Sequence, residues 1–238
     1  TPEGLRALAA IAETYAAEVR SAISQNLLLR FVPEEALGGL YEALLEAGLA
    51  LPEAHTLLDI TRCPGADTCN LAITRSRGLA QALEAHLSAL PLAQDPGAKA
   101  IGVKISGCPN SCGQHHIADI GFYGSSRKVG EREVPHYVLL LGGRTREGEA
   151  RFGQVVGRIP ARRVPEAVER ILKRYLEERQ NGESFQAYLD RVGAASFKPL
   201  LQDLQEVPPY EEAPEFYQDL GAEGEAFSVQ LGRGECAV

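Results

Sequence analysis

The first fifty residues alternate between apolar stripes at helical spacing and one continuous apolar run. Pro2 and Pro33 each precede a stripe, which predicts two helices, the second ended by Gly48. The stretch "AISQNLLLRFV" between them lacks that spacing and is expected to be extended. The two stripes are Leu5, Leu8, Ala12, Tyr15 and Leu37, Leu40, Tyr41, Leu44. A helix–strand–helix unit of this size is too small to bury enough apolar surface to be stable alone.

Further along, strand-like runs end in loops that carry cysteine. "HTLLDIT" predicts a strand leading to Cys63, and "AIGVKIS" predicts one leading to Cys108. Asp67 and Thr68 resemble helix N-caps, so a long helix is expected to follow with Cys69 in its first turn. Strands are also expected at "IADIGFY", "HYVLLLGG" and "GQVVGRI", and helices from Pro165 and over "SFQAYLDRVG". Hairpin-like runs beside alternating elements favour an α+β fold.

Composition narrows the class of protein. The 238 residues are 45% hydrophobic, and the sequence has neither an apolar run long enough to cross a bilayer nor a signal peptide. We therefore expect a cytoplasmic protein, with neither membrane nor nucleic acid as partner. Five cysteines in such a chain disfavour disulfides. The complete absence of methionine suggests one piece of a longer polypeptide.

The net charge of −8 is unevenly distributed along the chain. Residues 202–238 hold nine Asp and Glu against one Arg, which predicts an acidic tail that is draped over a surface or mobile. Residues 127–174 hold twelve Lys and Arg against six Asp and Glu. This basic stretch could face an anionic cofactor or an acidic protein, or could equally be a solvated surface of mixed charge. Its candidate exposed cations are Arg127, Lys128, Arg132, Arg162 and Arg163.

Four thiols form two pairs with unequal spacing. "RCPGADTC" places Cys63 and Cys69 six apart, and "GCPNSCG" places Cys108 and Cys112 four apart. Structural zinc prefers short knuckles in both halves of a site, whereas an iron–sulfur cluster tolerates wider spacing. The spacing thus favours a cluster and leaves zinc or inert thiols open. Glycines beside the cysteines free backbone N–H groups to approach cluster sulfur atoms.

The combination of C-x₅-C with a later G-C-P-N-S-C-G resembles the signature of the sirohaem-containing nitrite and sulfite reductases. The resemblance implies that Cys63, Cys69, Cys108 and Cys112 bind a [4Fe–4S] cluster, and that the sulfur of Cys112 also bridges to the sirohaem iron. It also implies two lobes: a ferredoxin-like lobe over residues 1–52 and a larger mixed-sheet lobe over residues 53–200, followed by the acidic tail, residues 201–238. The chain then looks like the C-terminal half of such an enzyme, inactive without its N-terminal half.

By the same resemblance, the complete enzyme reduces a small anion by six electrons, with ferredoxin or a similar donor. The segments "SCGQ" and "ADIGFYG" resemble nitrite reductases, which form ammonia, more than sulfite reductases, which form sulfide. A cofactor-binding scaffold without activity, or a zinc-binding interaction protein, is the alternative of another class.

Other candidate residues follow from the resemblance, and an alternative interpretation is given for several of them. Gln25 and Asn26 are similar to a family pair near the macrocycle, or are a polar strand end. Asn110 and Gln114 would shape the region of the bridge. Arg75 and Arg77 could pair with sirohaem carboxylates, or could lie on a solvated helix face. His115 and His116 are expected to line the cofactor pocket or pack in the core rather than bind metal. Cys236 is expected to be an unliganded thiol.

Overall fold

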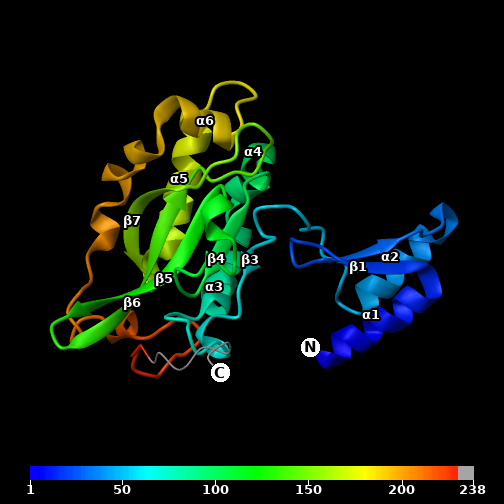
Figure 1. Cartoon of the computed structure of the whole chain (residues 1–238), viewed down its shortest axis with the longest axis horizontal. Coiled ribbons are helices and arrows are strands. Elements are labelled where there is room, and N and C mark those ends of the chain that lie inside the picture. Colours follow the sequence, from blue (N-terminus) through cyan, green and yellow to red (C-terminus); the bar gives the residue numbers. More distant parts are fainter. Residues whose placement is uncertain (230–238) are drawn as a thin grey trace. The chain divides into compact units, whose positions relative to one another are not determined.

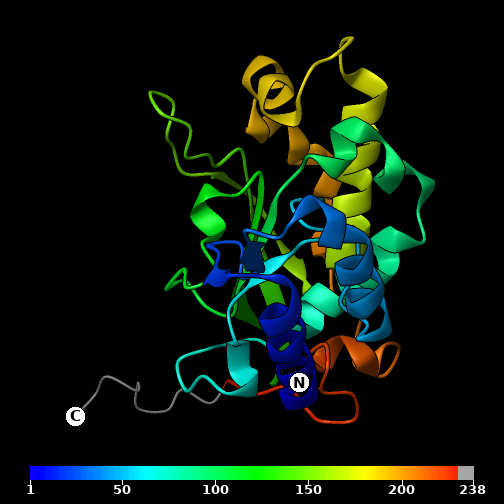
Figure 2. The same ribbon diagram turned by 90° about the vertical axis from the view of Figure 1, so that its right-hand side faces the viewer.

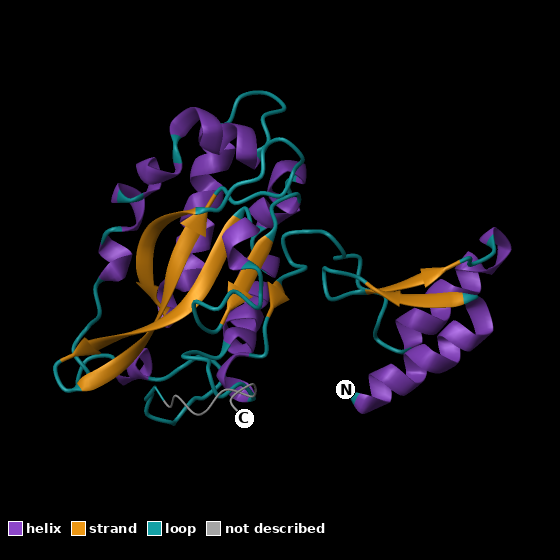
Figure 3. Ribbon diagram, in the orientation of Figure 1, coloured by secondary structure: helices purple, strands orange, loops and turns teal. Residues whose placement is uncertain are grey.

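The computed structural model describes residues 1–229 and separates them into two compact units. The smaller unit is Thr1–His55, and the larger unit begins at Thr56. Each unit is described by itself below. Figure 1 follows the chain through both of them, and Figure 3 marks helices and strands by colour.

The smaller unit has two helices and a two-stranded antiparallel hairpin. Its elements are α1 (Pro2–Tyr15), β1 (Glu18–Ser21), β2 (Leu27–Arg30) and α2 (Leu37–Glu46). The Thr1 hydroxyl caps α1 by accepting the N–H of Gly4 at 3.1 Å. Both helices appear as predicted. Of the run expected to be extended, Leu27–Arg30 is strand β2, whereas residues 22–26 form the turn between β1 and β2, where Gln25 adopts a φ of 66°.

The larger unit is built on a five-stranded mixed sheet in the order β3-β4-β5-β6-β7. The first three strands run parallel and the remaining pairs antiparallel. Its strands are β3 (Thr61–Arg62), β4 (Val103–Ser106), β5 (Ile120–Val129), β6 (Arg132–Leu141) and β7 (Gln154–Pro160). Of the expected strand "HTLLDIT" only its last residue, Thr61, lies in a strand; residues 55–58 form turns and residues 59–60 are irregular. The predicted α+β class with a mixed sheet is confirmed.

Two long helices cover one face of this sheet; the second of them is the yellow helix beside the green strands in Figure 2. The helices of the unit are α3 (Ser76–Ser88), α4 (Pro96–Lys99), α5 (Val164–Glu178) and α6 (Phe185–Val192). One apolar core joins them to the sheet: Leu83 of α3, Ile171 of α5 and Leu139 of β6 are all fully buried in it. The opposite sheet face carries the alternate residues of each strand.

Short 3₁₀ turns connect these elements. They are Glu34–Ala36, Gly65–Asp67, Pro91–Gln94, His115–Ile117, Ala161–Arg163, Ala194–Phe197, Pro199–Leu201, Asp203–Gln205 and Pro214–Tyr217.

The helix expected to begin at Cys69 begins seven residues later, at Ser76. The cause is long-range. The N–H groups of Ile73 and Thr74 both donate to the carbonyl oxygen of Gly107, at 2.8 and 3.0 Å, instead of entering a helix. Cys69 therefore lies in a loop, and the prediction that it lies in the first turn of a helix was wrong.

The acidic tail packs on the larger unit as far as residue 229. We call residues 202–229 the C-terminal strap, seen in orange to red in Figure 1. Leu204, Tyr217 and Leu220 of the strap are buried. Of the two forms expected for the tail, the draped one describes this segment, with 3₁₀ turns in place of extended chain. Cys236 lies outside the described residues.

Candidate iron–sulfur and haem site

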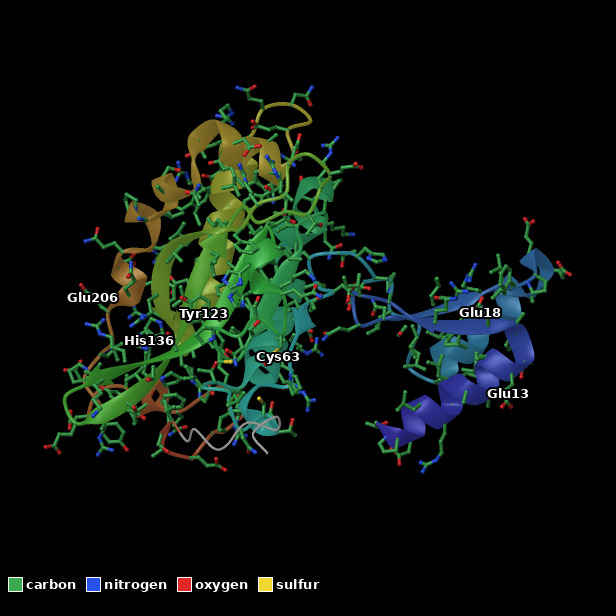
Figure 4. All side chains as sticks on the ribbon, viewed as in Figure 1. Glu13, Glu18, Cys63, Tyr123, His136 and Glu206 are labelled. Atoms are coloured by element: carbon green, nitrogen blue, oxygen red, sulfur yellow. The ribbon has the colours of Figure 1, made fainter. Side chains whose placement is uncertain are left out.

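The two cysteine loops begin at the same edge of the sheet. β3 and β4 are adjacent and parallel, and Thr61 pairs with Lys104. Cys63 follows β3 directly, and Cys108 follows β4 after Gly107. Because parallel neighbours end at one edge, both loops start together. Figure 4 labels Cys63 there.

Backbone and hydroxyl groups connect the two loops tightly. The N–H of Gly107 donates to the sulfur of Cys63 at 3.1 Å, and the Ser76 hydroxyl donates to the carbonyl oxygen of Cys63 at 2.6 Å. Gly107 has no space for a side chain, since a Cβ there would overlap Thr74 and Gly65. Gly65 itself has a φ of 65° and faces the backbone of Ser76. These close approaches require glycine at both positions.

The Cys108 thiol lies within electrostatic reach of the other three signature thiols. Burial raises the pKa of the Cys108 thiol, and negative charge on Cys63, Cys112 and Cys69 raises it further, against the N–H of Asn110, which donates to it. Within residues 1–229, however, no three His, Cys, Asp or Glu side chains converge as ligands of a single metal ion would. Ligands of a four-iron cluster sit on different irons and need not converge on one point. The thiol set therefore fits a cluster.

Behind Cys112, a buried serine and histidine fix the backbone of the loop. Ser106 Oγ accepts the N–H of Gly113 at 3.1 Å and lies 2.8 Å from Nδ1 of His115. Burial, followed by the neighbouring His116, lowers the pKa of His115 to about 4. His115 is thus a neutral, packed residue at physiological pH, one of the two roles expected for it. Cys112 itself is exposed.

An aromatic row that the sequence did not reveal runs beside this loop. Ring centroids are 5.1 Å apart for Phe152 and His116, 4.1 Å for His116 and His115, and 4.8 Å for His115 and Tyr123. Phe152 is 70% exposed, so the row extends from the surface to the interior. Its members come from three separate segments, and only the two histidines are neighbours in sequence.

The sheet face opposite the helices is polar and contains buried atoms without partners. Lys104, Tyr123 and His136 lie on this face, on successive strands β4, β5 and β6; Figure 4 labels Tyr123 and His136. Within the described part of the chain, Nε2 of His136 and Nε2 of His115 are buried and accept or donate no hydrogen bond. Buried polar atoms of this kind normally have partners. Such a face fits a cofactor that supplies them.

The remaining candidates are dispersed. Gln114 has a φ of 62° and accepts from Nζ of Lys104 at 3.0 Å. The guanidinium of Arg75 donates to the carbonyl oxygen of Gly221 at 2.9 Å and pairs with Glu225 at 3.3 Å, so it is engaged within this chain. Arg77 is exposed. Gln25 and Asn26 lie in the smaller unit, so a role for them near the macrocycle stays a prediction.

The C-terminal strap contacts most of the cations proposed for the basic stretch. Arg162 and Arg163 donate to the carbonyl oxygens of Glu215 and Asp203, at 3.1 and 2.9 Å. Arg127 donates to Gln205 at 3.5 Å, and Arg132 stacks on a strap tyrosine. The stretch is therefore largely the docking surface of the chain's own strap. Arg127, Lys128 and Arg132 nevertheless remain exposed.

Comparison with family models matches both units. Residues 53–207 match the nitrite and sulphite reductase 4Fe-4S domain, and residues 1–47 match the nitrite/sulfite reductase ferredoxin-like half domain. The fold and the cysteine site thus define a 4Fe-4S redox domain. The chain belongs to the nitrite and sulfite reductase family, whose cofactors are a [4Fe–4S] cluster and sirohaem.

Relatives include reductases of both kinds. A ferredoxin–nitrite reductase of Synechococcus elongatus is 33% identical over 149 residues, covering 60% of this chain and 28% of that protein. A sulfite reductase [NADPH] hemoprotein beta-component of Methylobacterium nodulans is 28% identical over 196 residues, covering 81% and 31%. The chain therefore spans about a third of the length of these relatives.

Solved structures agree on the fold. The structure of the Mycobacterium tuberculosis NirA protein superposes with a TM-score of 0.68 at 26% identity, over 79% of this chain and 35% of that chain. Dissimilatory sulfite reductase I superposes with a TM-score of 0.58 at 15% identity, over 87% of this chain and 67% of that one, which supports the fold alone.

Proposed function

We propose that Cys63, Cys69, Cys108 and Cys112 bind the [4Fe–4S] cluster and that Cys112 is the sulfur shared with the sirohaem iron. The meeting of the two cysteine loops at one edge of the sheet in the matched domain, joined by the bond from the N–H of Gly107 to the sulfur of Cys63, carries this proposal. When bound, the two cofactors supply the electron transfer and the anion-binding iron. This chain supplies the thiolates and the N–H donors of Gly107 and Asn110, which stabilise negative sulfur.

Around those ligands, the chain orients the bridge and faces the macrocycle. Ser106 and His115 fix the turn that presents Cys112 at the surface. Lys104 fixes Gln114, and desolvation lowers the pKa of this lysine. We infer that the sheet face opposite the helices, with buried and partnerless imidazole nitrogen atoms, lies toward the sirohaem.

The complete enzyme is proposed to reduce nitrite to ammonia. The segments "SCGQ" and "ADIGFYG" and the 33% identical ferredoxin–nitrite reductase support this choice. Sulfite reduction to sulfide is the second candidate, because the sulfite reductase relatives match a larger share of the chain. Comparing the rates of nitrite and sulfite consumption by the full enzyme, with one artificial donor, decides between them.

Activity is proposed to require an N-terminal half that is not in this chain. The chain spans about a third of its relatives' length, and the smaller unit exposes apolar side chains such as Leu28 and Phe31 that a second half-domain could cover. Alone, the chain should bind cofactor without turnover. Steady-state reduction of either anion by this chain would contradict the proposal.

Ferredoxin is the proposed electron donor, and the cytoplasm the proposed location. Two relatives are named as ferredoxin enzymes, and no helix within residues 1–229 is long and apolar enough to cross a membrane. Arg127 and Lys128, exposed near the end of β5, are two of the cations left for an acidic donor. Charge reversal of both should weaken ferredoxin-dependent rates, more at low salt, and spare rates with a small artificial donor.

Two measurements test the cofactor assignment directly. Iron and acid-labile sulfide per reconstituted chain should fall to background in a Cys69→Ser or Cys108→Ser variant, whereas Cys236→Ser should leave them unchanged. In the complete enzyme, Cys112→Ser should abolish multielectron reduction. Stoichiometric zinc without sulfide in the reconstituted chain would overturn the assignment in favour of a zinc site.

A further inference from the structure

The C-terminal strap is fixed to the segment that separates the cysteine loops from α3. Its Asp219 is 4% exposed, and its carboxylate accepts the backbone N–H of Arg75 at 2.7 Å and that of Leu220 at 2.9 Å. Arg75 is the N-cap position of α3 and has no side-chain cap of its own. A carboxylate beside the first turn of a helix is favourable. Asp219 therefore provides that turn with an anionic partner from 144 residues away.

Three further contacts bind the strap to the same place. The guanidinium of Arg75 donates to the carbonyl oxygen of Gly221 and pairs with Glu225. Gly78 in α3 lies so close to Leu220 that a Cβ would overlap its carbonyl group. The strap thus packs directly on the helix backbone.

The residues on either side of Arg75 hold the cysteine loops. Thr74 donates its N–H to Gly107 and accepts the N–H of Ala66 at 3.0 Å, and Ser76 donates its hydroxyl to Cys63. A shift of Arg75 would therefore disturb the support of both loops at once. Through Arg75, the strap thus acts on both loops.

The strap also forms a wall beside Cys69. A cavity of about 370 Å³ lies between the loop of residues 66–73, which includes Cys69, and strap residues Asp219, Glu225 and Phe227. Cys112 does not line this cavity. Loss of the strap contacts would thus expose Cys69 more than Cys112.

We propose that Asp219 is a positioning residue of the cluster site, through which the C-terminal strap holds Arg75 and shields Cys69 from solvent. One consequence of this inference, that the strap helps to retain the cluster, rests on the proposed ligand role of the cysteines. The geometry of the strap and loop carries the rest.

The decisive experiment labels the thiols of the cluster-free 238-residue chain with a maleimide and reads each cysteine by tandem mass spectrometry. Asp219→Ala removes a cap worth about 1 kcal/mol, so local opening should accelerate Cys69 labelling about fivefold. Cys112, already exposed, should change little. Asp219→Asn keeps one acceptor oxygen and should restore most of the protection. Glu212→Ala, which removes an exposed acid of the same strap, is the matched control.

The outcomes separate this inference from the proposed function. Glu225→Ala, which removes a 71% exposed partner of Arg75 and cannot unfold the core, should accelerate Cys69 labelling to a smaller extent. Unchanged Cys69 labelling in both variants would overturn the inference. So would an equal acceleration of Cys69 and Cys112 that follows the thermal midpoint, because that would show a general loss of stability. If the unmodified chain binds no iron and sulfide on reconstitution, the ligand assignment fails while the labelling result still stands.

With a reconstituted cluster, the consequence is also measurable. Bleaching of its visible absorption in air should be faster in Asp219→Ala than in the unmodified chain and the Glu212→Ala control. Equal bleaching rates would show that the strap does not protect the cluster.

Discussion

The two units of the chain differ in how much of their apolar surface they bury themselves. In the larger unit, side chains from α3, α5 and the sheet reach complete burial in one continuous core. In the smaller unit, only Ala12 and Leu40 are buried, while Val19, Leu28 and Phe31 are 45%, 54% and 67% exposed. Both units have well-formed helices and paired strands. The difference shows that regular secondary structure alone does not make a self-sufficient fold, because burial supplies most of the stabilisation.

Producing the two units as separate fragments should give the largest difference between them in thermal unfolding. Residues 56–238 produced alone should unfold in one cooperative thermal transition, because their core is complete. Residues 1–55 should show none, because so short a chain with so little burial cannot offset its conformational entropy. Circular dichroism against temperature measures both. A cooperative transition of monomeric 1–55 would contradict the view that this unit needs a partner surface.

Deletion of one leucine in each unit tests the same contrast within the intact chain. Leu83→Ala in α3 removes a fully buried side chain and should lower the free energy of unfolding by about 2–5 kcal/mol. Leu28→Ala in β2 should change it by less than about 0.5 kcal/mol, since that side chain is more than half exposed. Urea unfolding of the larger unit's signal gives both values. Similar losses would mean that Leu28 is covered in solution.

How much of this could be read from the sequence depends on whether the determinants are local. The strands β5, β6 and β7 and the helix α5 were predicted because apolar spacing within each segment decides them. The start of α3 was missed because the carbonyl oxygen of Gly107 captures the N–H groups of Ile73 and Thr74. No pattern near residue 70 contains that information.

The features of the functional site also separate into those set by local sequence and those set by long-range contacts. The four cysteines were predicted as cluster ligands from their motif, which is a local feature. The row of Phe152, His116, His115 and Tyr123, and the contact of Asp219 with Arg75, join segments far apart in sequence and emerge only once the sheet is formed. The basic stretch and the acidic tail were both noticed as charge runs, but their contact with each other was not predicted.

Buried charge provides a further contrast, because Asp219 lies against the core of the larger unit. Burial raises the pKa of this carboxyl to about 6 despite the N–H groups of Arg75 and Leu220. Between the usual aspartate pKa and 6, the folded state thus binds more protons than the unfolded state. Stability should fall as the pH rises through that window, by at most about 3 kcal/mol from this group.

The variant Asp219→Asn isolates this contribution. Its free energy of unfolding, measured in the cluster-free chain between pH 4 and pH 7 (about the range of the shift), should lack the fall seen in the unmodified chain. The slope at more acidic pH should remain in both, since Arg191 lowers the pKa of Glu183 to about 2. Identical pH profiles in the two proteins would show that Asp219 titrates normally.

The smallest expected effect comes from adding one methyl group to a helical glycine in each unit. A Cβ on Gly38 in α2 would meet no atom within 4 Å, so Gly38→Ala should stabilise the helix by up to about 0.5–1 kcal/mol through reduced backbone entropy. A Cβ on Gly78 in α3 would overlap the carbonyl group of Leu220, so Gly78→Ala should destabilise by about 1–3 kcal/mol. The opposite signs follow from the closed packing of one unit and the open surface of the other. If Gly38→Ala lowers the free energy of unfolding in urea, another surface contacts the face of α2 around Gly38 in solution. That result would contradict the open surface inferred for the smaller unit.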